Sequence, residues 1–319
     1  ELTGDIVTEE GRTRIDKVRL TAGGALVEGA AQDIFGAQPA GAFSVAIPDL
    51  AAFGTLLLRD DLAGSLNGTA EIGSPDGVRS LRVTLTSPAL ALQDVHVEQG
   101  KLDATIRILP DMLAINGAVT AAKIVHGEIM VEQPRLTAAS EGSATRFDLR
   151  AQVNGAPSAA AGSLRLQDAT AYLTLNEASG AYAGIAGKLA APASVRIGQD
   201  TAWIDKLQLA IGGGTIEVSG QAGEVLDLAV KLTSLPASAI DRFADRGLAG
   251  AVSGALSVSG SVADPQVSYD LVWSDFSTAD LSASAVPALS LTAKGRYAKD
   301  QVRLNTNLSG SGVRATVNG

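Results

Sequence analysis

The chain has 319 residues, a formal net charge of −9 at pH 7 and no cysteine. Its basic residues form no Lys/Arg cluster, which argues against nucleic acid as a partner. The lack of cysteine excludes a disulfide framework and a thiolate metal site. Hydrophobic residues make up 46% of the chain and aromatic residues only 4%, so aliphatic side chains account for the positive mean hydropathy of +0.19.

The first predicted elements are strands on either side of a short helix. The strand Ile15–Leu20 precedes the turn residues Gly23 and Gly24, and Leu62–Gly68 reads as a strand punctuated by glycine. Between them, Pro48–Leu58 predicts a short helix, because proline suits the first helical turn and the apolar residues lie three or four apart.

The middle of the chain alternates most clearly between apolar and polar residues. In Lys101–Ile108, aliphatic residues alternate with Lys, Asp, Thr and Arg, and Arg146–Asn154 repeats this pattern. A period of two predicts strands with one aliphatic face and one polar face. Turn residues recur every dozen or so positions, and connections this short favour antiparallel neighbours. The simplest topology is a long meander.

An internal repeat relates the second half of the chain to the first. Ile204–Leu209 repeats the pattern of Ile15–Leu20 at an offset of 189 residues, and both segments precede a run of glycines. Leu248–Gly254 repeats Leu62–Gly68 at an offset of 186 residues. Two matching patterns at nearly one offset make chance similarity improbable and indicate a tandem array.

The second copy continues in the same order as the first. Val225–Leu232 predicts a strand, Pro236–Ala244 a second short helix, and Val267–Trp273 a further strand. The uncharged run Leu248–Ala263 alternates with Ser and Gly, so it predicts strands and not a membrane-spanning helix. We therefore predict two modules, residues 1–200 and residues 201–319, with Val302–Gly319 as the start of another unit.

No pattern in the chain indicates catalysis or metal binding. His96 lies between two valines on the polar face of a predicted strand, His126 precedes a turn glycine, and neither has a metal-ligand spacing. The run Gly212–Gly214 leads into a strand, so it predicts a turn and not a phosphate cradle. Acidic residues such as Asp103 and Asp148 occur singly. We predict a protein that is not an enzyme and uses no cofactor or metal.

The aliphatic face has two possible interpretations. One is the packed core of a sandwich or closed solenoid, and the other is an open apolar groove. About 25 strands at ~4.8 Å spacing would form a sheet about 120 Å long, which two short helices cannot cover. Soluble proteins rarely leave contiguous apolar patches beyond a few hundred square ångströms, so the face requires a cover of some kind.

Two motifs carry a resemblance to a known family. The first is the alternating unit from Leu248 to Ser261, with Gly at positions 250, 254 and 260, followed by Asp264-Pro265-x-Val267. The second is Trp203–Leu209 before the triple glycine. Both resemble the repeats of TamB and its AsmA-like relatives, large envelope proteins of Gram-negative bacteria. The first copy departs from the pattern after Ile72, where it is several residues shorter.

The resemblance implies an all-β fold, a long twisted antiparallel sheet curled into a hydrophobic trough (a β-taco), with one or two short helices. It also implies that the chain is a central fragment of a protein anchored in the inner membrane, outside this sequence, and extending through the periplasm to a TamA-like outer-membrane barrel. The implied function is non-catalytic conduction of phospholipids between the two membranes. The alternative is a scaffold for the assembly of outer-membrane β-barrel or autotransporter proteins, which would bind by strand addition.

On the transport hypothesis, phospholipid acyl chains contact the aliphatic face directly. The predicted groove residues share that face of their strands and are Leu102, Ile106, Ile108, Phe147, Leu149, Val153, Leu207, Leu209, Ile211, Ile216, Val218, Leu226, Leu228, Val230, Leu232, Val252, Leu256, Val258, Val267, Tyr269 and Leu271.

Overall fold

The computed structural model describes residues 1–9, 12–34, 36–54, 61–109, 112–167, 170–182, 184–239, 241, 246–299, 301–310 and 312–319. These residues form 24 strands and two α-helices, and the strand pairings among them are antiparallel. The expected all-β antiparallel sheet with short helices is therefore confirmed. The chain divides into two compact units, Glu1–Gln167 and Asp168–Gly319. The boundary predicted from the repeat, at residues 200 and 201, rests on sequence alone and stays a prediction.

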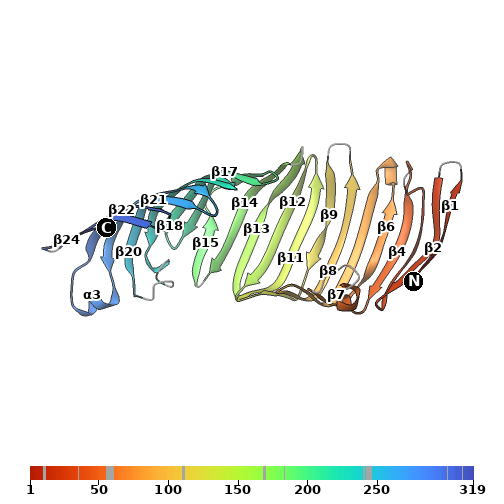
Figure 1. Ribbon diagram of the computed structural model, residues 1–319, viewed down its shortest axis with the longest axis horizontal. Coiled ribbons are helices and arrows are strands. Elements are labelled where there is room, and N and C mark those ends of the chain that lie inside the picture. The colour runs from red at the N-terminus through yellow and green to blue at the C-terminus, as the bar shows by residue number, and fades with distance from the viewer. Residues whose placement is uncertain are drawn as a thin grey trace. The chain divides into compact units, whose positions relative to one another are not determined.

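The first unit is an up-and-down meander whose strands lie side by side in one layer (Figure 1). Its elements are β1 (Leu2–Glu9), β2 (Arg12–Ala22), β3 (Ala25–Gln32), β4 (Ala40–Ile47), α1 (Leu50–Gly54), β5 (Leu62–Gly64), β6 (Leu66–Gly73), a 3-10 turn η2 (Pro75–Gly77), β7 (Ser80–Leu92), β8 (Val95–Ile108), β9 (Leu113–Thr120), β10 (Lys123–His126), β11 (Ile129–Glu141), β12 (Ala144–Val153) and β13 (Ala156–Gln167).

The second unit is also a meander. Its elements are β14 (Thr170–Tyr182), β15 (Ile185–Leu189), β16 (Ala193–Ile197), β17 (Thr201–Ile211), β18 (Gly214–Gly223), β19 (Val225–Pro236), β20 (Ala249–Ser261), β21 (Pro265–Ser277), α3 (Ala279–Ala283), β22 (Leu289–Ala298), β23 (Gln301–Gly310) and β24 (Val313–Asn318).

The sequence repeat has the same local structure in both copies. β2 has a bulge between Ile15 and Val18, and β17 has the corresponding bulge between Ile204 and Leu207. The partner of Val18 is Gly29, and the partner of Leu207 is Val218, which is the same register shifted by 189 residues. The repeated pattern thus encodes a bulged hairpin, in which the extra residue bends the strand and increases its twist.

The two predicted helices differ in how much of each is described. In Pro48–Leu58 the structure has the single-turn helix α1, Leu50–Gly54, and residues 55–60 lie outside the described residues. In Pro236–Ala244, Pro236 is still the last residue of β19. Residues 238, 239 and 241 are helical, and the rest of that prediction lies outside the described residues. The helix α3 was not predicted; Thr278 caps it, because its side chain accepts a hydrogen bond from the Leu281 N–H.

A crease crosses five neighbouring strand positions of the first unit. At this line β5 ends and β6 begins, and β9 ends and β10 begins. The strands β7, β8 and β11 cross the line with a bulge or an irregular register. Gln99 and Gln133 have positive φ angles of 50° and 49° at this line, as bulged residues often do. The crease consists of Ser65, Ser87, Pro88, Gln99, Gly100, Ala121, Ala122, Gln133 and Pro134.

Backbone hydrogen bonds keep the strands joined through the crease. The Ala122 N–H donates to Glu98 O over 2.9 Å, and the Ala121 N–H donates to Pro134 O over 3.1 Å. The Ser65 N–H donates to Ala89 O over 3.0 Å. The sheet is therefore bent at this line but not broken, and most crease residues are small.

A small core lies under α1 at one end of the first unit. Ala25, Ile47 and Leu50 are buried together, and Leu50 is only 7% exposed. Half-buried residues pack around them, among them Phe53 and Leu66. Among the described residues of the whole chain, no large side chain is completely buried. Most of the aliphatic face is therefore not covered by another layer of this chain.

Candidate apolar groove

Five aliphatic residues form a continuous row across the first unit. Leu85 pairs with Leu102, Leu102 with Val119, Val119 with Leu136, and Leu136 with Leu149. Residues directly opposite one another on neighbouring strands share a face, so these side chains project to the same side of the sheet. We call this row the upper bank.

The upper bank is open to solvent over three of its five strands. Val119 is 45% exposed, and Leu136 and Leu149 are each 37% exposed. A packed core would bury such side chains almost completely. The open-groove interpretation of the aliphatic face therefore fits this part of the first unit, and the packed-core interpretation fits only the cluster beneath α1.

A second aliphatic row lies on the other side of the crease. Leu90 pairs with Val97, Val97 with Ile124, Ile124 with Val131, and Val131 with Val153. Each bulge adds one residue to its strand and so shifts the alternation by one position. The aliphatic residues beyond the crease therefore project to the same side of the sheet as the upper bank. We call this row the lower bank.

The two banks enclose a hollow that follows the crease across the strands. Its volume is about 430 Å³, within the range typical of small-molecule sites. The crease supplies its floor, because Gly100 has no side chain and Ser87 and Ala121 have small ones. No Lys, Arg, Asp or Glu belongs to either bank. The polar residue Lys101 also borders the hollow, but it pairs with Thr86 and Thr120 in the row of opposite orientation.

The apolar face of the second unit also has a row of five residues. Leu207, Val218, Val230, Leu256 and Tyr269 are successive partners on β17 to β21. The parallel rows on either side contain most of the other residues predicted for this unit, and they are Leu209, Ile216, Leu232, Leu271, Leu228, Val258 and Val267.

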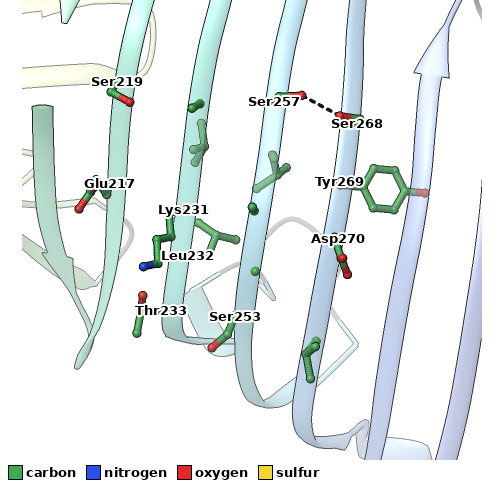
Figure 2. A pocket seen from close by; sticks show the side chains of 16 residues that line it. Glu217, Ser219, Lys231, Leu232, Thr233, Ser253, Ser257, Ser268, Tyr269 and Asp270 are labelled. Atoms are coloured by element: carbon green, nitrogen blue, oxygen red, sulfur yellow. Dashed lines mark hydrogen bonds between the residues drawn. The ribbon is translucent and has the colours of Figure 1, made fainter. Parts of the chain in front are cut away.

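Aromatic side chains occupy part of this second face. Tyr269 extends from β21 toward β22 (Figure 2), where a Cβ added to Gly295 would lie 2.4 Å from the Tyr269 hydroxyl oxygen. Trp273 packs edge-to-face on Phe276 with ring centroids 4.8 Å apart, and its indole N–H donates to Ala249 O over 2.9 Å. Val252, a predicted groove residue, pairs with Trp273 and is buried. The face is therefore partly filled near these rings.

A different hollow, of about 890 Å³, lies over β18 to β21 of the second unit (Figure 2). Its polar-face residues include Glu217 and Lys231, which are opposite each other, and the exposed pair Ser257 and Ser268, whose hydroxyls lie 2.7 Å apart. Asp270 is also on this face and forms an ion pair with Lys294. This hollow therefore lies on the face that carries Glu217, Lys231 and Asp270, opposite to the aliphatic rows.

The remaining predicted residues lie on the same faces as the rows. In the first unit, Ile106 and Ile108 lie four and six residues after Leu102 on β8. Phe147 lies two residues before Leu149 on β12, and Val153 lies four residues after it. Ile108 is 56% exposed near the end of its strand. In the second unit, Ile211 pairs with Gly214, and Leu226 with Gly260. Their predicted contact with lipid is untested.

The sequence analysis missed several groove residues that the structure brings together. They are Leu85, Leu90, Val97, Val119, Ile124, Val131 and Leu136. A signal for them was present, because residues 85, 102, 119 and 136 are all Leu or Val at a spacing of 17. In an antiparallel meander a constant spacing of this kind places residues near the middle of successive strands opposite one another.

The described residues show no arrangement for metal chemistry or acid–base catalysis in the groove. They contain no group of three His, Cys, Asp or Glu side chains able to hold a metal ion. The imidazole of His126 lies 3.1 Å from the Asp94 carboxylate, and both side chains are exposed. The backbone N–H of Leu248 lowers the pKa of the Asp241 carboxyl, and this group lies outside both hollows.

None of the described helices is long and apolar enough to cross a membrane. No protein-family model matches the chain, and neither a curated protein nor a solved structure matches it. The resemblance to TamB and the AsmA-like proteins therefore stays a prediction from the sequence motifs.

Proposed function

We propose that this chain is a non-catalytic segment of a periplasmic bridge that conducts phospholipids between the inner and outer membranes. The observation that supports the proposal best is the upper bank, in which Val119, Leu136 and Leu149 stay open although they form a continuous aliphatic row. The resemblance noted in the sequence adds the periplasmic setting and the TamA-like partner.

The physical basis is transfer of alkyl groups from water to an apolar surface. Each methylene group that leaves water contributes about 0.8 kcal/mol. Aliphatic rows without charged members bind acyl chains with little positional preference, so a chain can slide from one strand to the next. The phospholipid headgroup stays near water at the edge of the groove.

A photo-reactive residue at position 119 tests the proposal directly. Val119 belongs to the upper bank, and its neighbour Ala118 lies on the opposite face, paired with Asp103 and Thr137. We expect illumination in cells to crosslink phospholipid at position 119 and not at position 118, as detected by mass spectrometry. Crosslinks from position 119 to unfolded outer-membrane barrel strands, without lipid, would instead support the scaffold function.

A charge on the apolar face of the second unit tests whether the groove conducts. Leu228→Arg should block lipid transfer while the fold is retained, because a guanidinium in an aliphatic row repels the acyl chain and retains water. The matched control is Ala229→Arg, which places the same side chain on the opposite, exposed face. Normal transfer by Leu228→Arg, with circular dichroism like that of the control, would contradict conduction along this face.

A further inference from the structure

Ser87 is an exception within the apolar hollow of the first unit. It lies on β7 between the bank residues Leu85 and Leu90 and pairs with Gly100. It is 5% exposed, and its Oγ has no hydrogen-bond partner among the described residues. A buried hydroxyl without a partner is destabilising, and such a group in a native protein calls for an explanation, such as a bound molecule that accepts its hydrogen bond.

The residue paired with Ser87 contributes no side chain to the hollow. Gly100 directly opposite has no side chain, and a Cβ built there would lie 3.3 Å from Val97 Cγ1 and 4.0 Å from Ser87 O. Both Ser87 and Gly100 line the 430 Å³ hollow. The site is therefore a buried hydroxyl between two aliphatic banks, and Thr86, Thr120 and Lys101 border the same hollow.

We propose that this site binds the ester carbonyl of a glycerophospholipid acyl chain, with Ser87 Oγ–H as the donor. This inference rests on the proposed function and refines it, because it gives the conducting groove one position where an acyl ester is recognised. The alkyl chain lies between the upper and lower banks, and the carbonyl oxygen accepts the hydrogen bond that the protein itself does not provide.

The charge of the site favours a neutral ester over a free fatty acid. An ionised carboxylate loses much of its hydration energy in an apolar hollow and needs a cation or several donors in exchange. The banks contribute no Lys or Arg, and Ser87 offers a single donor. Lys101 borders the hollow, but it belongs to the row of opposite orientation, with Thr86 and Thr120. An ester carbonyl carries no charge, so one hydroxyl satisfies it.

The test compares matched ligands at a local reporter. Because the chain has no cysteine, Val131→Cys gives one labelling site in the lower bank for a polarity-sensitive dye. The labelled chain is titrated with dioctanoyl-phosphatidylcholine, with its dioctyl ether analogue and with octanoate. We expect the diester to bind roughly three- to tenfold more tightly than the diether, as one neutral hydrogen bond provides. Octanoate should bind more weakly than the diester.

The variant Ser87→Ala should bind both phosphatidylcholines with equal affinity, at the level of the diether. It should also fold, with an unfolding midpoint unchanged or raised, because it removes a hydroxyl that has no partner. The control Ser257→Ala removes a hydroxyl on the polar face of the second unit and should keep the preference for the diester.

The possible failures are distinct. Equal binding of diester and diether by the unsubstituted protein, or a preference that survives Ser87→Ala, would overturn the ester site and leave the alkyl groove intact. Octanoate binding as tightly as the diester would overturn the choice of a neutral ester. No response to any of the three ligands, together with no lipid crosslinked at position 119, would overturn both the site and the proposed function.

Discussion

The two units carry copies of one sequence repeat but present their apolar faces differently. In the first unit the crease divides the aliphatic face into two banks, and the hollow lies on the apolar side. In the second unit the rows from β18 to β21 cross the face without a central crease, and the larger hollow includes the charged pair Glu217 and Lys231 on the other side. The same binary pattern thus supports two different surfaces.

Both units have bulges on adjacent strands, and those of β19, β20 and β21 lie near one end of the strands. The position of the bulges and the aromatic residues distinguish the two faces. A bulge on several adjacent strands concentrates the bend along one line and leaves room there for a ligand. In the second unit the corresponding space beside β21 contains the rings of Tyr269, Trp273 and Phe276. Aliphatic rows alone therefore do not make a groove, because it also needs a bend and small residues along that bend.

The largest expected effect separates the core of the first unit from its groove. Leu50→Ala should lower the free energy of unfolding by about 3 kcal/mol, because Leu50 is buried with Ala25 and Ile47. Leu102→Ala on the upper bank should cost only about 1 kcal/mol, because its side chain loses less burial. Urea unfolding monitored by circular dichroism measures both. Equal losses would mean that the upper bank is a packed core.

A smaller effect is expected from the aromatic cluster of the second unit. Trp273→Phe keeps most of the ring but removes the hydrogen bond to Ala249 O, and we expect a loss of about 1 kcal/mol. Trp273→Ala also removes the contact with Phe276 and should cost about 2 kcal/mol. If neither substitution changes the urea midpoint, the rings do not brace this face and the contrast between the units disappears.

The smallest effect is expected on the polar face. Asp270→Asn removes the ion pair with Lys294, whose atoms lie 2.8 Å apart with both side chains more than half exposed. Exposed pairs contribute about 0.5 kcal/mol or less, and salt screens them. The stability difference should vanish in 1 M NaCl. Loss of alkyl-ligand binding in this variant would show that the hollow on the polar face, and not the creased groove, is the binding surface.

Only a small part of the groove was predictable from strand alternation, which is a local property. Leu102 and Leu149 were predicted from two-residue alternation alone, and the structure pairs their strands into one row. Ser87 and Val97 were not predicted. The register of β7 and β8 shifts at the crease, so alternation along either strand does not show that the two residues share a face.

The sequence by itself determined the all-β class, the two faces of each strand and the repeated bulged hairpin, because alternation, turn glycines and hairpin register act over a few residues. Only the tertiary structure decided which rows stay open and where bulges on separate strands align into a crease. It also decided that Ser87 pairs with a glycine, which has no side chain, in the hollow along that crease. These features depend on pairings between strands, so the local pattern of any one strand does not contain them.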